Sequence, residues 1–424
     1  MSHDRPFGLS PRPLNRRTLL KAAAAAGAAQ VAAPFIISAR GEVPVRIGMV
    51  DPLTGVYAAV AQNEVIGAQL ALDRVNASGG MLGRQVELLI EDSANDVGTG
   101  VQKTRKLIER DQVNFIIGDV NSAVAQAMAQ VTAEKKVLHI VSGGHTDGIT
   151  GSDCKWNVFR VCNTTRMEAN SVSSLLFNKY GKKWHFITPD YAFGHTLQDA
   201  CTANLKKLGG TVTGAELTPL GTSDFSAYLI KARAANPDVL VLLPQGSDMV
   251  NCLKQIVQFG IHKQLHIAGT QQELESLEAL PPEARIGTWM FEWYWKQEAP
   301  HVAEFVAEVR KRSGGKVPTA RTWFGYTSLH SLAQVVNAEK TLDDTLKLSR
   351  ALGGMELPPE VKLQPNKCYY RAGDHQLMTS AFIGQAQSKG ADDAEDLFKV
   401  DQIVAGDETA PPVSETGCTL RFPA

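Results

Sequence analysis

VRIGMVDPLTG, at residues 45–55, opens the part of the chain that decides the fold. A short apolar run followed by small polar residues is typical of a buried strand and the loop at its carboxyl end. The same change recurs in NFIIGDVNSAVAQAMAQV at residues 114–131 and in VLHIVSGGHTDGIT at residues 137–150. Because such strands alternate with helix-like segments, we predict an α/β fold with a doubly wound parallel sheet.

The alternation begins again near Trp184. We expect strands at residues 184–188, 212–217, 237–246 and 265–270, with helices between them at 194–208, 226–235 and 247–258. An aromatic strand at 287–295 and helices at 302–312, 322–336 and 342–351 follow, and a strand-like segment at 367–373 precedes a tail that is acidic from Ala391. Two successive alternating halves predict two similar lobes, each with its own parallel sheet.

Length and composition agree with two soluble lobes. A chain of 424 residues exceeds the size of one ordinary core. With 44% hydrophobic and 21% charged residues and a net charge of -1, it carries no basic surplus that would indicate a nucleic-acid partner. Beyond the N-terminal region, no apolar run is long enough to predict a membrane span.

Residues 1–40 have the pattern of a twin-arginine signal peptide. NRRTLLK at residues 15–21 precedes an alanine-rich run, and the small residues around Ala33 or Ala39 suit cleavage there. A short transmembrane anchor is the alternative, which we disfavour because the run is weakly apolar and shorter than the roughly 20 residues a span needs. Since no cysteine precedes Cys154, we expect a free periplasmic protein without a lipid anchor.

Export to an oxidising compartment allows disulfides to form. Cys154 and Cys162 flank a predicted strand, and we expect them to pair. Six cysteines allow about 15 connectivities, so the remaining four stay unassigned: Cys201, Cys252, Cys368 and Cys418. There is no CxxC motif, and His262 and His266 straddle a turn, so we predict neither a metal site nor a cofactor.

In an open parallel sheet, ligands bind outside the carboxyl ends of the strands. Polar and aromatic residues at those ends form the candidate site, namely Tyr57, Asn121, Ser122, Gly144, His145, Thr146, Tyr191, Phe193, Gln245 and Gln271. Ser122 suits a ligand oxygen because it stands at the start of a helix, although an ordinary helix cap would use the same residue. Those two roles remain open at this point.

The sequence gives no sign of catalysis. It contains no GxSxG, HExxH or P-loop motif. His145, Asp190 and His195 could supply acid or base groups, but their spacing specifies no catalytic set. We therefore expect binding alone and no enzymatic activity.

Five segments together resemble a known family. IGMVDPLTG, NASGGMLGRQVELLIEDSAND, FIIGDVNSAVAQAM, VLHIVSGGHT and DYAFGH resemble the type I periplasmic substrate-binding proteins of the leucine/isoleucine/valine group, which serve ABC importers. The resemblance implies two lobes that close on a small ligand and are joined by three crossovers, near Arg160, Met290 and Pro365. It assigns residues 43–162 and 291–365 to the first lobe, and 163–290 and 366–424, including the C-terminal tail, to the second.

The resemblance also assigns roles at the site. Ser122 and Thr146 match the positions that hold a ligand carboxylate, and Phe193 matches an aromatic residue of the second lobe. Gln271 stands where amino-acid binders place a glutamate for the ligand ammonium, and Gln245 stands where a tyrosine is expected. An amide cannot neutralise a buried ammonium. We therefore expect a ligand with a carboxylate or amide but without an ammonium group, unless the nearby Glu273 takes that role.

These expectations combine into one functional prediction. The protein is expected to be a monomeric periplasmic component of an ABC importer that delivers a small molecule to a membrane permease. The ligand would be an amino acid, an aromatic or aliphatic acid, or an amide. The alternatives are a sensor of the same fold that reports to a receptor and, less favoured, an exported enzyme.

Overall fold

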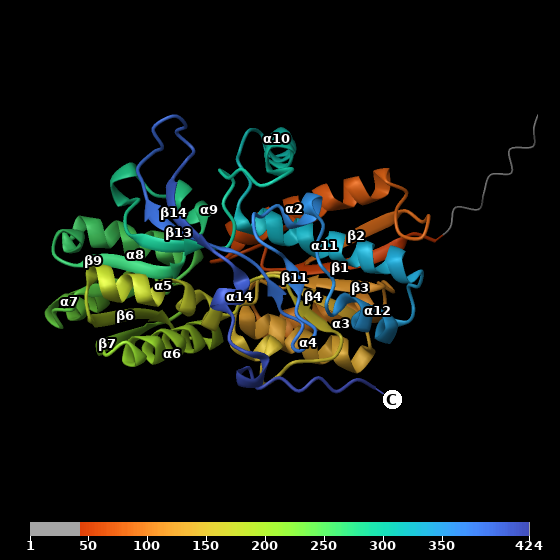
Figure 1. Cartoon of the computed structure of the whole chain (residues 1–424), viewed down its shortest axis with the longest axis horizontal. Coiled ribbons are helices and arrows are strands. Elements are labelled where there is room, and N and C mark those ends of the chain that lie inside the picture. The colour runs from red at the N-terminus through yellow and green to blue at the C-terminus, as the bar shows by residue number, and fades with distance from the viewer. Residues whose placement is uncertain (1–42, 424) are drawn as a thin grey trace, which may run out of the picture. The chain divides into compact units, whose positions relative to one another are not determined.

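A computed structural model describes residues 43–423, which contain two large sheets and the helices packed on them (Figure 1). The predicted signal peptide lies outside the described residues. Within residues 43–423, no helix combines the length and the apolar character needed to cross a membrane.

The first sheet has five parallel strands in the order β2-β1-β3-β4-β5. Its central strands are almost wholly buried, which is why they appear in the sequence as continuous apolar runs. The strands are β1 (Val45–Asp51), β2 (Val86–Asp92), β3 (Phe115–Gly118), β4 (Leu138–Val141) and β5 (Val158–Arg160).

Two helices far apart in the sequence meet beside this sheet, α2 (Ala58–Ala77) and α11 (Ala320–Glu339). A Cβ atom on Gly67 would lie 1.8 Å from the Thr322 carbonyl oxygen, and one on Gly325 would lie 1.9 Å from the Glu64 carbonyl oxygen. Only glycine permits such close backbone contact. The crossing therefore brings the start of α11 against Glu64. The other helices of this lobe include α3 (Val97–Glu109) and α4 (Ser122–Lys135).

The second sheet has seven strands in the order β14-β13-β10-β9-β8-β6-β7. Six of the strands run in one direction, whereas β13 runs antiparallel to both of its neighbours, β10 and β14. The strands are β6 (Lys183–Pro189), β7 (Thr211–Thr218), β8 (Val239–Leu242), β9 (His266–Gln271), β10 (Thr288–Phe291), β13 (Ala381–Ala386) and β14 (Phe398–Val404). The associated helices are α5 (Thr165–Tyr180), α6 (Ala192–Lys207), α7 (Ser226–Ala234), α8 (Gly246–Gln258) and α9 (Leu274–Glu278).

Shorter elements complete the described chain. They are α10 (Val302–Arg312), α12 (Thr345–Leu352), α13 (Pro359–Lys362), α14 (Gly406–Thr409), β11 (Tyr369–Tyr370), β12 (Leu377–Met378), and four 3-10 turns at Asp147–Thr150, Ile261–Lys263, Pro282–Ala284 and Val413–Glu415. The two-lobed α/β fold predicted from the alternation is confirmed, with one sheet in each lobe.

Several predicted elements need correction. Helix α5 and strands β13 and β14 were not expected, and the tail from Ala391 supplies a strand of the second sheet. The aromatic strand ends at Phe291, while Trp293 and Tyr294 beyond it are buried in the core. Trp293 and Tyr294 fill the core although they lie outside the strand. An aromatic run therefore does not distinguish a buried strand from an irregular buried segment.

The third passage between the lobes lies later than the predicted position near Pro365. Strands β11 and β12 pair with each other, and Arg160 at the end of β5 pairs with Gln376. The buried Arg160 also donates from Nε to the Gln376 side-chain oxygen at 2.7 Å. Residues 369–378 therefore contact the first lobe, and the chain reaches the second sheet only at Ala381, where β13 begins.

The predicted disulfide between Cys154 and Cys162 is wrong, because Cys154 pairs with Cys418. Cys154 lies in a half-buried turn that the C-terminal segment passes, whereas Cys162 is fully buried behind β5 and free. The other three cysteines of the described chain, Cys201, Cys252 and Cys368, are buried and free as well. The disulfide ties the segment after β14 to the first lobe.

We expect loss of this disulfide to lower stability, because it closes a loop with a sequence separation of 264 residues. The double variant Cys154→Ser/Cys418→Ser should lose about 2–5 kcal/mol of the free energy of unfolding, measured by denaturant titration. The wild-type protein in reductant should show the same loss, and the double variant should not respond to reductant. Equal stability of the oxidised wild type and the double variant would contradict a role for this bond.

Candidate functional site

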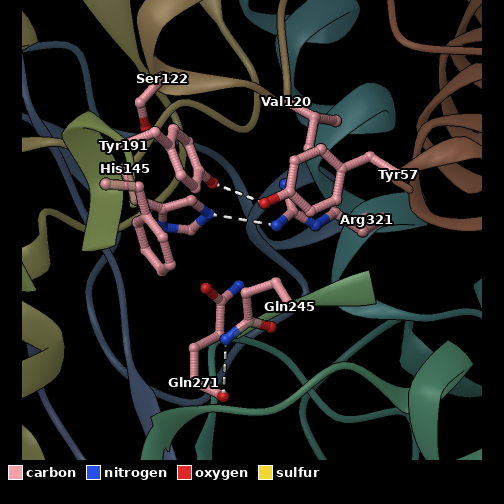
Figure 2. Close-up of a pocket in the computed structure, with 9 residues that line it drawn as sticks. Tyr57, Val120, Ser122, His145, Tyr191, Gln245, Gln271 and Arg321 are labelled. Atoms are coloured by element: carbon pink, nitrogen blue, oxygen red, sulfur yellow. Dashed lines mark hydrogen bonds between the residues drawn. The ribbon is translucent and has the colours of Figure 1, made fainter. Parts of the chain in front are cut away.

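A small cavity lies among the loops at the carboxyl ends of strands from both sheets (Figure 2). Side chains of both lobes line it: Tyr57, Val120, Ser122, His145 and Arg321 from the first, and Tyr191, Phe193, Gln245 and Gln271 from the second. The wall therefore depends on segments that are up to 264 residues apart in the sequence, from Tyr57 to Arg321.

The loop after β3 is held by two buried carboxyl groups. Asp51 accepts a hydrogen bond from the Val120 backbone N–H at 3.2 Å, and Asp119 accepts one from that of Asn121 at 2.7 Å. The Asn121 side chain then caps α4 by accepting from the backbone N–H groups of Ala123 and Val124. Asn121 is thus the helix cap, which answers the question left open for Ser122.

Ser122 is free to face the cavity because Asn121 performs the capping. Its Oγ accepts a hydrogen bond from the Thr146 backbone N–H at 3.1 Å, which leaves the hydroxyl proton available to a ligand oxygen. Ser122 is nearly fully buried. The contact joins the ends of β3 and β4.

His139 supports the same loop from within the first sheet. Its Nε2 donates to the Gly118 carbonyl oxygen at 2.7 Å, and Nδ1 lies 3.3 Å from Thr132 Oγ1. The ring is fully buried. Burial lowers the pKa of His139 to about 4, so the ring stays neutral near pH 7.

Aromatic residues close one side of the cavity. The hydroxyl groups of Tyr57 and Tyr191 are 2.6 Å apart and form a hydrogen bond between the lobes. Phe193 packs against both neighbours, with its ring centroid 5.9 Å from that of Tyr191 and 5.9 Å from that of His145. Nearby, Gly246 has φ of 59°, and a Cβ there would lie 2.4 Å from the Val56 carbonyl oxygen. The loops of the two lobes thus meet at backbone distance.

Arg321, at the start of α11, is the buried cation of the cavity. Its Nη1 lies 3.0 Å from a carboxylate oxygen of Glu64 in the first lobe, and its Nη2 lies 2.6 Å from one of Glu273 in the second. Burial disfavours the guanidinium charge, but Glu273 and Glu64 outweigh it and raise the pKa of Arg321 above its ordinary value. The cation is thus already paired with protein carboxylates from both lobes.

Two glutamines form the far end of the cavity, away from the tyrosine pair (Figure 2). Gln245 donates from Nε2 to the Gln271 carbonyl oxygen at 3.2 Å, and Gln271 donates from Nε2 to Glu273 at 3.0 Å. The side-chain oxygens of both glutamines are buried and accept no hydrogen bond. Such acceptors are costly to leave unpaired, so this end of the cavity favours a donor group.

The structure brings most of the predicted site residues to one cavity, but three lie behind its wall. Asn121 caps α4, and Thr146 contacts Ser122 and Thr196. The Gly144 carbonyl oxygen accepts a hydrogen bond from Arg160. Sequence reasoning missed Arg321. An arginine at a helix start among apolar and aromatic residues was the available signal, but its position against Glu64 depends on the crossing of α2 and α11.

Comparison with known proteins decides the family. The profile of the periplasmic binding protein family matches residues 44–391, most of the chain. The chain belongs to this family. A Leu/Ile/Val-binding protein homolog 1 from Brucella suis biovar 1 (strain 1330) is 28% identical over 359 residues, which cover 84% of this chain and 93% of the relative.

Solved structures of periplasmic binding proteins share the fold. One from Burkholderia mallei is 26% identical with a TM-score of 0.81 and covers 88% of this chain and 98% of its own. An amino acid ABC transporter substrate-binding protein from Pseudomonas fluorescens Pf-5 is 25% identical with a TM-score of 0.79 and covers 89% and 99%. The resemblance noted in the sequence is confirmed, and it identifies the lobes as those of the type I periplasmic binding protein fold.

Stability should depend on pH through His139. Its ring has a pKa of about 4 in the folded protein, against an ordinary value of 6.5, so the unfolded chain takes up a proton first as pH falls. The free energy of unfolding should therefore hold its full value above pH 6.5 and lose about 3 kcal/mol between pH 6.5 and pH 4 from this ring.

Denaturant titrations of the wild type and of His139→Gln between pH 6.5 and pH 4 measure the part of the free energy of unfolding that depends on this ring. The variant should lack it, while other buried histidines keep the remaining pH dependence. The exposed His301→Gln is the matched control and should keep the wild-type slope. Equal slopes for His139→Gln and the wild type would contradict the neutral, buried ring.

Proposed function

We propose that this protein is the solute-binding component of an ABC importer, acting as a monomer in the periplasm and delivering its ligand to a membrane permease. The observation that carries the proposal is the cavity, whose wall combines strand-end loops of both lobes. A ligand bound there contacts both lobes at once, so its binding energy favours their closed arrangement. The twin-arginine route and the cleavage near Ala33 or Ala39 are part of this proposal.

The ligand class follows from the unpaired groups that face the cavity. The buried side-chain oxygens of Gln245 and Gln271 require an N–H donor, and the Ser122 hydroxyl can donate to an oxygen. A small molecule with a carbonyl or carboxylate oxygen at one end and an amide N–H at the other satisfies both ends. We propose a small amide, or a small acid with such a group, as the ligand.

An amino acid fits this arrangement less well, although relatives are named for leucine, isoleucine and valine. A buried ammonium needs a carboxylate partner. Glu273 is the nearest candidate, but one of its oxygens already binds Arg321 and Gln271, and its side chain does not line the cavity. The glutamine end of the cavity therefore offers neutral amide oxygens, whereas a buried ammonium group would need a carboxylate there.

Ser122→Ala should weaken binding of isobutyramide by about 1–3 kcal/mol, because the ligand oxygen loses one buried hydrogen bond. Isothermal titration calorimetry on both proteins measures the change. Ser226→Ala, at the start of α7 and outside the cavity, serves as control and should bind as the wild type does. An unchanged affinity for Ser122→Ala would remove this residue from the ligand site.

Gln271→Glu should shift the preference from amides to ammonium-bearing ligands, because a carboxylate replaces a neutral acceptor at that end. Calorimetry with benzamide, isobutyramide, benzoate and leucine should show leucine gaining about tenfold or more, equal to 1.4 kcal/mol, and the amides losing affinity. Gln258→Glu, on the exposed end of α8, adds the same charge outside the cavity and should change nothing. Micromolar leucine binding by the wild type, with no binding of amides or acids, would contradict the proposed ligand class.

A further inference from the structure

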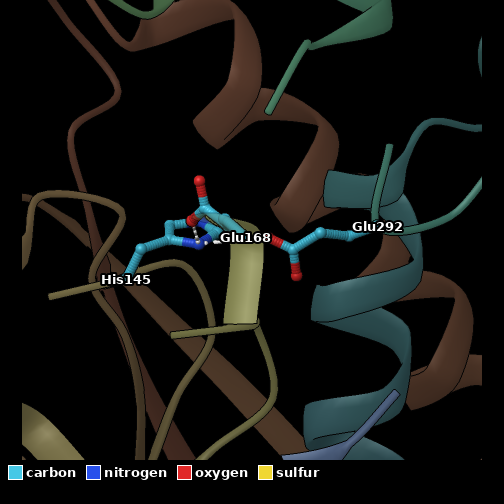
Figure 3. A group of neighbouring side chains, drawn as sticks. All are labelled: His145, Glu168 and Glu292. Atoms are coloured by element: carbon cyan, nitrogen blue, oxygen red, sulfur yellow. Dashed lines mark ion pairs between the residues drawn. The ribbon is translucent and has the colours of Figure 1, made fainter. Parts of the chain in front are cut away.

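Three buried side chains converge next to the cavity, each from a different segment (Figure 3). His145 follows β4, Glu168 belongs to α5, and Glu292 directly follows β10. The His145 Nδ1 atom lies 3.0 Å from Glu168 Oε1 and 3.0 Å from Glu292 Oε1. All three ligand-type atoms lie within 4.8 Å of one another, and the side chains are at most 4% exposed.

The three converging atoms make no aligned hydrogen bond. His145 Nδ1, Glu168 Oε1 and Glu292 Oε1 are each buried without a hydrogen-bond partner, despite the short distances between them. The carboxylate oxygens thus flank the direction in which an Nδ1–H bond would point. Two atoms that bind one zinc ion at about 2.0–2.2 Å are themselves about 3.0–3.5 Å apart, so a shared cation accounts for both the spacing and the misalignment.

The remaining oxygens of the two carboxylates are fixed by neighbouring groups. Glu168 Oε2 accepts from Thr270 Oγ1 at 3.1 Å, and Glu292 Oε2 accepts from the Asn163 backbone N–H at 2.7 Å. Outer contacts of this kind orient the ligands in metal sites. They hold one oxygen of each carboxylate in place and leave the other aimed at His145.

The two buried carboxylates among these three residues also favour a cation between them. Glu168 and Glu292 are both fully buried, and Arg321 is already paired with Glu64 and Glu273. The buried Arg160 interacts electrostatically with Glu292, but it donates its hydrogen bonds to Gln376, Thr150 and the carbonyl oxygens of Gly144 and Thr146. Two buried carboxylates converge on His145 Nδ1, and a divalent ion can contact all three atoms at once.

We propose that His145, Glu168 and Glu292 bind a divalent transition-metal cation, with one imidazole nitrogen and two carboxylate oxygens as ligands. This donor set suits zinc and its first-row neighbours. The ligands belong to both lobes and to the segment after β10, so the bound ion links the two lobes next to the cavity.

Metal binding at Nδ1 places the remaining ring proton on Nε2. That atom lies 3.3 Å from Arg321 Nη2, itself a donor, so the contact must lengthen when the ion binds. Arg321 keeps its pairs with Glu64 and Glu273. Because His145 and Arg321 both line the cavity, the ion can influence its shape without being part of the ligand.

Zinc alone is the probe for this site. The full-length mature protein, stripped with chelator and then incubated with zinc chloride, should retain about one equivalent after gel filtration and should melt at a higher temperature. Cobalt(II) should bind in its place and give visible absorption from the ion. Glu292→Gln should abolish stoichiometric retention, and Thr270→Val, which removes only the contact that orients Glu168, should weaken zinc binding by about 10- to 100-fold.

The control is the exposed pair of His195 and Asp190, 2.9 Å apart, which could also attract zinc at the surface. His195→Gln should bind zinc as the wild type does. If Glu292→Gln does not fold, the Thr270→Val titration and the cobalt spectrum of the wild type still decide the question. Retention well below one equivalent, no cobalt spectrum, or equal zinc binding by Thr270→Val would overturn the proposal and leave the three residues as a buried ion-pair cluster.

Discussion

The buried guanidinium of Arg321 is the interaction on which the closed cavity depends. It pairs with Glu64 in the first lobe and with Glu273 in the second, and all three side chains are at most 3% exposed. Removing one member of such a group leaves an uncompensated buried charge, a change that costs about 3–5 kcal/mol. The glycine contacts between α2 and α11 place Arg321 against Glu64, and the loop after β9 brings Glu273 to the same point.

This arrangement leaves the glutamine end of the cavity lined by neutral amide side chains. Arg321 is matched by protein carboxylates, and Glu273 orients Gln271, whose free oxygen faces the cavity. The tyrosine pair and Phe193 supply the apolar side. The lining of the cavity thus combines hydrogen-bonding groups with aromatic surface, and the ligand class proposed above rests on this combination.

The sequence predicted those parts of the fold that follow from local patterns. Buried strands such as β1, β3 and β4 are continuous apolar runs that end in polar loops, so the strand ends, and with them Ser122, Phe193 and Gln271, could be located. Long-range contacts could not. The pairing of Cys154 with Cys418 and the approach of Arg321 to Glu64 each join segments more than 250 residues apart, and no spacing in the sequence encodes them.

Native mass spectrometry of the protein purified from the periplasm tests the proposed ligand class, because it weighs any molecule that the cavity holds. One small molecule per chain should co-purify, identified after release as a compound with an amide group and no ammonium, and it should be lost in Ser122→Ala. Release of leucine or another amino acid, retained by Ser122→Ala, would contradict the ligand assignment and the role given to the two glutamines.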